Sequence, residues 1–147
     1  MIKTEFLIIG QGISGTFLSW YLEKAGRSFI VIDNNDASSS SRVAAGIINP
    51  VTGRRVVKTW MIDEIMPFAV NAYEEMGQAL GVNAIASTKM IEFFPSAQMR
   101  IAFSERAAGS HREYISLPND ESKFSGDFNY ELGCGEIAPC YIANLQD

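Results

Sequence analysis

The sequence predicts an α/β protein organised around one strand–helix–strand unit near its N-terminus, and three observations support this fold class. Two short apolar segments, residues 6–9 and 29–32, have the length and composition of buried strands. Between them lies a segment from Thr16 to Lys24 that can form an amphipathic helix. The turn before that helix holds three glycines in the pattern G-x-G-x-x-G. This order of elements is typical of two parallel strands joined by a helix.

Each glycine of the turn has its own expected role, which is why their spacing is informative. Gly10 permits a tight turn after the first strand, and Gly12 lacks a β-carbon, so a pyrophosphate can approach its backbone. Gly15 lets the helix pack close to the flanking strands. The helix that follows the turn starts with unpaired N–H groups and a positive dipole end, both of which favour a phosphate.

The second predicted strand is followed directly by an acid, Asp33. A carboxylate at this place can accept hydrogen bonds from both ribose hydroxyls of an adenosine, and it would repel a ribose 2′-phosphate. Together with the glycine turn, Asp33 predicts a Rossmann-like unit that binds an unphosphorylated adenosine dinucleotide. The alternative is a glycine-rich turn that binds nothing, because glycines also gather in turns for structural reasons.

Composition and charge limit the other function classes. The chain has 147 residues, of which 47% are hydrophobic and 20% charged, as in a folded domain with a real core. Its formal net charge of -5 makes nucleic acid an unfavourable partner. No apolar run reaches the roughly 18 residues that a membrane span needs. We therefore predict a cytoplasmic protein with no nucleic-acid partner and no membrane span.

The cysteines and the histidine predict neither a metal site nor a catalytic pair. Cys134 and Cys140 have the spacing of neither a redox pair nor a zinc knuckle, so buried thiols or loop residues are expected. His111 lies in a polar stretch and is predicted to be a solvated loop residue rather than a catalytic base. We expect no metal, and no catalytic residue can be assigned from the sequence.

After Asp33 the chain is polar and then rich in small residues. Residues 34–42 predict a loop, which is either a loose surface connection or part of the site, since Arg42 at its end could meet a phosphate. In residues 43–55 the small side chains and Gly46 would let the backbone lie close to a flat ligand.

The run Ser-Arg-Val-Ala-Ala-Gly-Ile-Ile-Asn-Pro at residues 41–50, shortly after a glycine turn and an acid, resembles the D-amino-acid oxidase-like family of FAD-dependent oxidoreductases. Glycine oxidase and sarcosine oxidase belong to this group. The resemblance implies FAD as the cofactor, an amine or amino acid as the substrate, and a place along FAD for the small-residue segment. The cofactor contacts predicted in all are Gly10, Gly12, Ile13, Ser14, Gly15, Asp33, Asn34, Ser41, Arg42, Ala44, Ala45 and Gly46.

The rest of the chain predicts further helices and strands. A helix is expected from Trp60 to Leu80, ended by Gly81, with Pro67 either kinking it or starting its second part. The later expected elements are a strand at 89–94, a helix at 96–108, a strand at 128–132 and an apolar segment at 137–142; residues 112–127 stay unassigned.

In the family resembled, this later part belongs to a substrate domain. We expect residues 1–85 to be the N-terminal part of an FAD-binding domain, and 86–147 to be a partial α+β substrate domain with the start of a return to the first. The predicted function is an FAD-dependent oxidoreductase of the amine or amino-acid oxidase type, as an N-terminal portion with little activity alone and a tendency to self-associate. An NAD-dependent dehydrogenase is one alternative, although such an enzyme has no reason to resemble the flavin family at residues 41–50. A non-catalytic nucleotide-binding fragment is the other.

Overall fold

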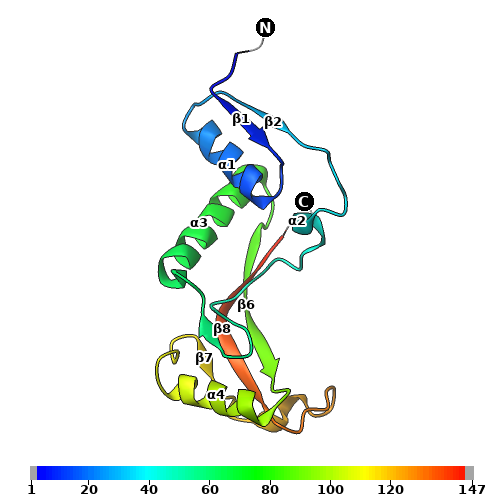
Figure 1. Ribbon diagram of the computed structural model, residues 1–147, viewed down its shortest axis with the longest axis vertical. Coiled ribbons are helices and arrows are strands. Elements are labelled where there is room, and N and C mark those ends of the chain that lie inside the picture. The colour runs from blue at the N-terminus through cyan, green and yellow to red at the C-terminus, as the bar shows by residue number, and fades with distance from the viewer. Residues whose placement is uncertain (1–2, 145–147) are drawn as a thin grey trace. The chain divides into compact units, whose positions relative to one another are not determined.

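The computed structural model describes residues 3–144, and the chain divides into two compact units (Figure 1). The first unit comprises residues 1–46 with 144–147, and the second comprises residues 47–143. Helices and strands occur in both units, so the predicted α/β class is confirmed. The compact units divide after Gly46, whereas the predicted functional domains divide at residue 85, and that functional division stays a prediction.

The first unit is a strand–helix–strand unit with parallel strands. Its elements are β1 (Phe6–Ile9), α1 (Ile13–Lys24), β2 (Phe29–Ile32) and the short α2 (Ser40–Val43). Strands β1 and β2 pair in parallel over their whole length. Helix α1 begins at Ile13 rather than at Thr16, because Gly12 takes an extended N-cap conformation directly before it. Both strands have the predicted bounds.

The sheet of this unit has two strands and leaves apolar side chains in solvent. Within residues 3–46 only Ile8 is a buried hydrophobic residue, with 5% of its surface exposed. Leu7, Ile9 and Ile32 on the same strands are 56%, 82% and 55% exposed. Parallel strands are normally covered on both faces, so this unit has much apolar surface without cover.

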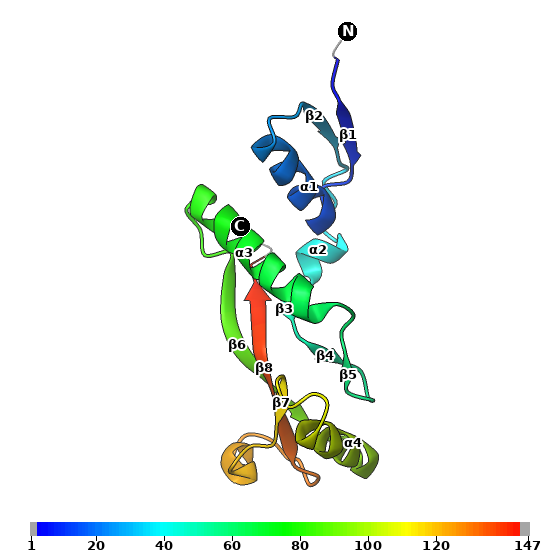
Figure 2. The same cartoon turned by 90° about the vertical axis from the view of Figure 1, so that its left-hand side faces the viewer.

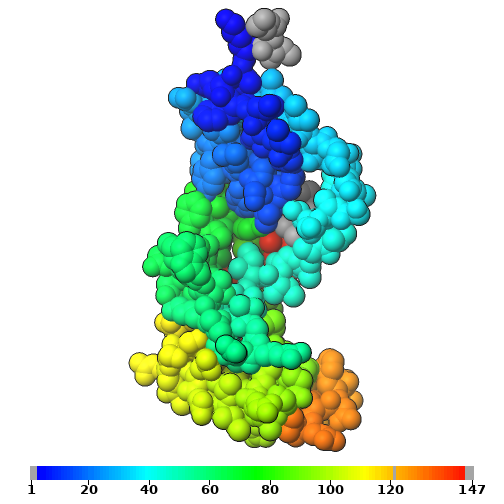
Figure 3. All heavy atoms as spheres, in the orientation of Figure 1, coloured from blue at the N-terminus to red at the C-terminus, as the bar shows by residue number. Residues whose placement is uncertain are grey.

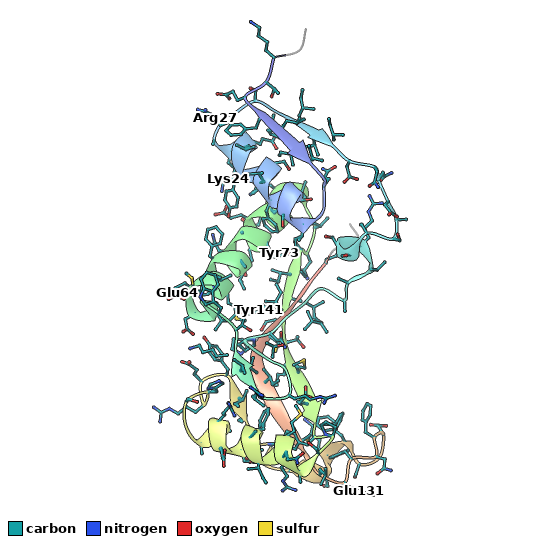
Figure 4. The ribbon with its side chains drawn as sticks, viewed as in Figure 1. Lys24, Arg27, Glu64, Tyr73, Glu131 and Tyr141 are labelled. Atoms are coloured by element: carbon teal, nitrogen blue, oxygen red, sulfur yellow. The ribbon has the colours of Figure 1, made fainter. Side chains whose placement is uncertain are left out.

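Charged residues join the two strands at the end remote from the glycine turn. Arg27 Nη2 lies 3.0 Å from Glu5 Oε1, and Glu5 Oε2 accepts a hydrogen bond of 3.0 Å from the backbone N–H of Ser28. Figure 4 shows Arg27 at the turn between α1 and β2, close to Lys24 of the last helical turn. These contacts are exposed, so they add little to the stability that the backbone pairing of β1 and β2 gives.

The second unit contains an antiparallel sheet around one long strand pair, β6 (Ile85–Phe93) and β8 (Cys134–Ala143) (Figure 2). The two further strands of the sheet, β3 (Ile47–Ile48) and β7 (Ile115–Ser116), also pair antiparallel with β8. Strand β6 starts earlier than the predicted residue 89, and the apolar segment 137–142 lies inside β8. A separate hairpin is formed by β4 (Val51–Thr52) and β5 (Val57–Lys58).

The predicted strand at residues 128–132 is wrong. These residues form an irregular segment after a short 3-10 helix, η1 (Glu121–Phe124). Their aromatic rings pack instead on Phe93, whose ring centroid lies 5.0 Å from that of Phe128 and 4.7 Å from that of Tyr130. The alternating apolar residues therefore serve side-chain packing on one ring of β6, and no strand pairing is needed.

Two helices complete the second unit, α3 (Ile62–Leu80) and α4 (Ala97–Ala108). Helix α3 is a single helix that contains Pro67, and it ends as predicted at Gly81, whose φ of 72° is the left-handed conformation of a glycine C-cap. Helix α4 begins at the N-cap Ser96, whose side chain accepts a hydrogen bond from the Met99 N–H.

The core of the second unit is centred on Phe103 of α4, which is fully buried. A β-carbon built on Gly135 would lie 2.3 Å from two atoms of the Phe103 ring, so only glycine lets β8 approach α4 this closely. Both cysteines are buried in β8, as expected of structural thiols. The buried residues of this cluster are Val51, Val56, Phe94, Met99, Phe103, Ile115, Ile137 and Cys140.

Candidate dinucleotide site

The glycine turn between β1 and α1 needs glycine at two positions for reasons that the geometry makes explicit. Gly10 has a φ of 95°, which side chains rarely allow, and its N–H donates a hydrogen bond of 2.8 Å to the carbonyl of Ile32. A β-carbon on Gly15 would lie 2.0 Å from the Gly10 carbonyl oxygen. The turn therefore closes tightly between the strands and the first turn of the helix.

The start of α1 has N–H groups that could bind an anion. The N–H of Ile13 donates to Ser41 Oγ at 3.0 Å, whereas those of Ser14 and Gly15 have no acceptor within residues 3–144. The first turn of the helix carries no acidic residue. A β-carbon on Gly12 would lie 3.1 Å from Ser41 Oγ, so a side chain there would press on the group that caps the helix. The positive helix end and its free N–H groups suit a phosphate.

The Asp33 carboxylate is joined to the same turn. Its Oδ2 accepts a hydrogen bond of 2.7 Å from the Gln11 N–H, and its Oδ1 accepts one of 2.7 Å from the Asn35 N–H. These two bonds, the one from Gln11 first, lower the pKa of Asp33, which stays ionised. Each carboxylate oxygen keeps a further lone pair, so the exposed carboxylate can still accept hydrogen bonds from ribose hydroxyls.

The loop after Asp33 is folded on itself through Arg42. The guanidinium of Arg42 donates to Asn35 Oδ1 at 2.6 Å and to the Asn35 carbonyl at 3.4 Å. Asn35 has a φ of 54°, a conformation that asparagine tolerates better than most residues. A loose surface connection would lack these contacts. Arg42 has five N–H donors, so it retains donors for a phosphate.

The structure brings together some of the predicted site residues and not others. Ser41 and Asp33 are bonded to the turn at residues 10–15, whereas Asn34 is exposed directly after Asp33. Ala44 and Ala45 are also exposed, Gly46 has a φ of 68°, and in the described part of the chain no hydrogen bond joins residues 44–46 to the turn.

Two site residues were missed by the sequence analysis, Gln11 and Asn35. Both act through the backbone N–H that holds Asp33, and Asn35 also holds Arg42. The available signal for Asn35 was a pair of asparagines after a strand-ending acid, since asparagine tolerates the left-handed conformation that Asn35 adopts. A backbone N–H leaves no trace in the residue type, so Gln11 had no signal.

A second polar cluster lies in the other unit and involves His111. Lys58 Nζ lies 2.6 Å from Asp63 Oδ2 and 2.9 Å from Glu113 Oε1, and the Tyr114 hydroxyl donates to Asp63. The hydrogen bond to Asp63 raises the pKa of Tyr114 to about 12, and the bond from Lys58 lowers that of Asp63. His111 lies in a turn, as predicted, but it is not fully solvated, because its half-buried ring accepts a hydrogen bond of 3.2 Å from the Lys58 N–H. These groups satisfy one another and join the hairpin to α3.

Residues 3–144 contain neither a metal cluster nor a membrane-spanning helix. No group of three or more histidine, cysteine, aspartate or glutamate side chains is arranged there to hold a metal ion. Nor does that part of the chain contain a helix with the length and apolar character of a membrane span.

Comparison with known families gives a match over most of the chain. The sequence model of the family described as "DAO: FAD dependent oxidoreductase" matches residues 5–121. No curated protein sequence matches the chain.

Comparison of the fold with solved structures gives similar chains at low identity. L-amino acid deaminase from Proteus myxofaciens, in complex with anthranilate, has a TM-score of 0.68 at 12% identity, over 98% of this chain and 34% of that one. L-amino acid deaminase from Proteus vulgaris gives 0.67 at 13%, over 98% and 35%. Iminodiacetate oxidase from Chelativorans sp. BNC1 gives 0.66 at 14%, over 97% and 41%. The chain thus has the fold of one part of these proteins and spans about a third to two fifths of their length.

Proposed function

The chain belongs to the family of FAD-dependent oxidoreductases, and from this membership we propose that its first unit binds the adenosine and pyrophosphate part of FAD. One observation carries the proposal. The ionised Asp33 carboxylate is hydrogen-bonded to Gln11 within the glycine turn, next to a helix start with two N–H groups that lack an acceptor in residues 3–144. A dinucleotide needs this combination, an anion site close to an acceptor for ribose hydroxyls.

The residues of the turn fit such a ligand. The N–H groups of Ser14 and Gly15 would donate to pyrophosphate oxygens, and Gly12, without a β-carbon, leaves the approach to them open. Asp33 would accept from the ribose hydroxyls and would repel a 2′-phosphate. Ser41 would act indirectly by holding the Ile13 N–H and so the start of the helix.

We propose that the reaction is the oxidation of a carbon–nitrogen bond in an amine or amino acid. When bound, FAD supplies the acceptor for the hydride that leaves the substrate carbon. The similar solved structures are described as amino acid deaminases and an iminodiacetate oxidase, which supports a substrate with an amino or imino group next to a carboxylate. The residues of this chain contribute binding and orientation of the cofactor, and no acid or base is assigned among them.

We further propose that this chain alone binds FAD weakly and oxidises amines at no useful rate. The two-stranded sheet leaves Leu7, Ile9 and Ile32 more than half exposed, and its contacts suit the adenosine half of the ligand. A ring system exposed to water lacks the positioned groups that orient a substrate for hydride transfer. The same exposed strands could pair between copies of the chain, which would appear as self-association.

The test is the visible spectrum of the purified chain mixed with FAD, followed by removal of free ligand. We expect a yellow complex with less than one flavin per chain, and no detectable hydrogen peroxide with a panel of amino acids and N-methyl amines. One tightly held flavin per chain with rapid peroxide formation would show that the chain is active by itself. Binding of NAD with no binding of FAD would support a nicotinamide enzyme, and binding of neither would contradict the dinucleotide site.

A further inference from the structure

Three arginines of the second unit line one cavity of about 530 Å³. Arg54 and Arg55 come from the turn between β4 and β5, and Arg106 comes from the last turn of α4. Within residues 3–144 none of the three guanidinium groups has a hydrogen bond or an ion pair. Figure 3 shows the teal residues of the hairpin against the yellow-green surface of α4.

One face of α4 forms a wall of the cavity. Gln98, Ala102 and Arg106 all line it, and their four-residue spacing places them above one another on the helix. The small side chain of Ala102 leaves room between the other two. The side-chain amide of Gln98 has two N–H donors that could bind a ligand in the cavity. Ser96, the N-cap of the helix, lines the end of the cavity where the helix dipole is positive.

The arginine turn of the hairpin is held by a buried anchor. Val56, which closes the turn, is 3% exposed in the core and donates its N–H to the Gly53 carbonyl at 2.9 Å. Its φ of 51° is unfavourable for a β-branched residue, so the surrounding core must hold it in this conformation. The two arginines at the tip are therefore presented by a fixed turn and not by a loose loop.

The positive charge of these arginines is not balanced by a carboxylate in the cavity lining. Among the residues that the structure describes, no aspartate or glutamate lines the cavity, although the chain as a whole has a net charge of -5. Elsewhere Arg27, Lys58 and Lys89 each form an ion pair with a carboxylate. Single arginines on a surface are commonly solvated and need no partner. Three from two separate elements around one cavity repel one another, and a bound anion would relieve this repulsion.

We propose that this cavity binds a phosphate dianion, either free inorganic phosphate or the phosphate group of a small monoester. Guanidinium groups bind phosphate oxygens through paired N–H donors. Three guanidinium groups offer more N–H donors than one carboxylate can accept, which favours phosphate over a carboxylate ligand. A volume of about 530 Å³ is within the range of small-molecule sites. The site lies wholly in the second unit and is independent of the flavin-binding role of the first.

Calorimetric titration of the 147-residue chain with inorganic phosphate and with glycerol phosphate, at constant ionic strength, tests the proposal. We expect saturable binding of at least one of them at one site per chain. Arg54→Gln, Arg55→Gln and Arg106→Gln should each weaken it about tenfold or more, the usual effect of losing a charge-assisted hydrogen bond. Arg112→Gln removes the same charge from the same unit but lies outside the cavity lining, and it should leave binding unchanged.

The outcomes distinguish free phosphate from a phosphate monoester as the ligand, and they show whether the site exists. Tighter binding of inorganic phosphate supports the free ion, and tighter binding of glycerol phosphate supports a phosphorylated metabolite. Absence of saturable binding overturns the proposal, as does an equal loss in Arg112→Gln, which would indicate general attraction to positive charge. Binding of a single-stranded oligonucleotide with no binding of either small phosphate also overturns it. Circular dichroism of each variant verifies that the fold is kept.

Discussion

Ser41 Oγ accepts a hydrogen bond of 3.0 Å from the backbone N–H of Ile13, and so a residue beyond β2 caps the helix that precedes β2. The usual cap is a side chain at the N-cap position, but that position is Gly12, which has none. The start of α1 therefore depends on residues 41–50, the segment that carries the family resemblance. The glycine turn and this segment form one structural feature.

Ser41→Ala should destabilise the first unit. Ser41 is not the N-cap residue, but its hydroxyl accepts from a first-turn N–H as an N-cap side chain does, and loss of such a bond costs about 0.5–2 kcal/mol. The free energy of unfolding from urea titration measures the effect. Ser40→Ala is the matched control, since its hydroxyl is exposed on the same short helix. Equal stability of the two variants would show that the Ser41 hydroxyl contributes nothing to the helix start.

Gly12→Val should abolish binding of FAD and leave the strands intact. Even the first carbon of the side chain would lie 3.1 Å from Ser41 Oγ, and the rest would occupy the space of the pyrophosphate. FAD titration, with circular dichroism in parallel, measures both effects. Gly126→Val is the control, because a β-carbon there meets nothing within 4 Å. A folded Gly12→Val protein with the FAD affinity of the parent would exclude the site.

Asp33→Asn should weaken binding of unphosphorylated adenosine dinucleotides by roughly tenfold to a hundredfold, the range expected when a charge-assisted hydrogen bond is lost. The parent should reject NADP, because the ionised carboxylate repels a 2′-phosphate. Competition among FAD, NAD and NADP measures the preference. Asp36→Asn is the control, because it lies in the same loop and its carboxylate accepts hydrogen bonds from Ser38 and none from the glycine turn within residues 3–144. Comparable affinity of the parent for NADP would contradict the role of Asp33.

The strand–helix–strand unit was predictable because its signals are local. The two apolar strands, Gly10 and Asp33 can each be recognised from a few neighbouring residues. The resemblance of residues 41–50 to FAD-dependent oxidoreductases is confirmed by the family match. Residues 128–132 show the limit. Their alternation fits a strand, and only the position of Phe93, far away in the sequence, shows that the rings pack on one another instead.

Gly135→Ala should destabilise the second unit by about 1–3 kcal/mol or more, the usual cost of forcing an extra carbon into a filled core. The added carbon would lie 2.3 Å from atoms of the Phe103 ring, which is fully buried and cannot move aside freely. Thermal unfolding measures the loss. In the double variant with Phe103→Leu, the two losses should be less than additive, because the smaller side chain gives room. Full additivity would show that the contact is not the cause.

Stability in alkaline solution should report on Tyr114. Its hydrogen bond to Asp63 raises its pKa from the ordinary 10.0 to about 12, so folding favours the protonated phenol. This stabilisation is complete below pH 10.0 and is lost as the pH rises through about 12. The stability difference between the parent and Tyr114→Phe should therefore shrink above pH 10.0 in thermal melts. Asp63→Asn should return the pKa toward its ordinary value, and a pH-independent difference would contradict the bond.

The candidate site was predictable in its residues more than in their contacts. Sequence spacing indicates that Ser41 and Arg42 follow the acid, but it contains no sign that one caps α1 and the other binds Asn35. The arginine cavity was not predictable at all. It depends on the packing of the β4–β5 turn beside α4, which is a contact between segments far apart in the chain.

The pairing of the short strand β3 with β8 has a consequence for the order of folding. Ile47 lies opposite Ile142, so this contact joins the two ends of the second unit, whereas β1 and β2 are joined by a single helix. Closing a longer loop costs more chain entropy before the strand contacts can compensate for it. During synthesis on the ribosome, the strand–helix–strand unit can form early, whereas β3 and β6 cannot pair until β8 has been synthesised. Pulse-labelling hydrogen exchange would detect this as late protection of β3 and β6 amides.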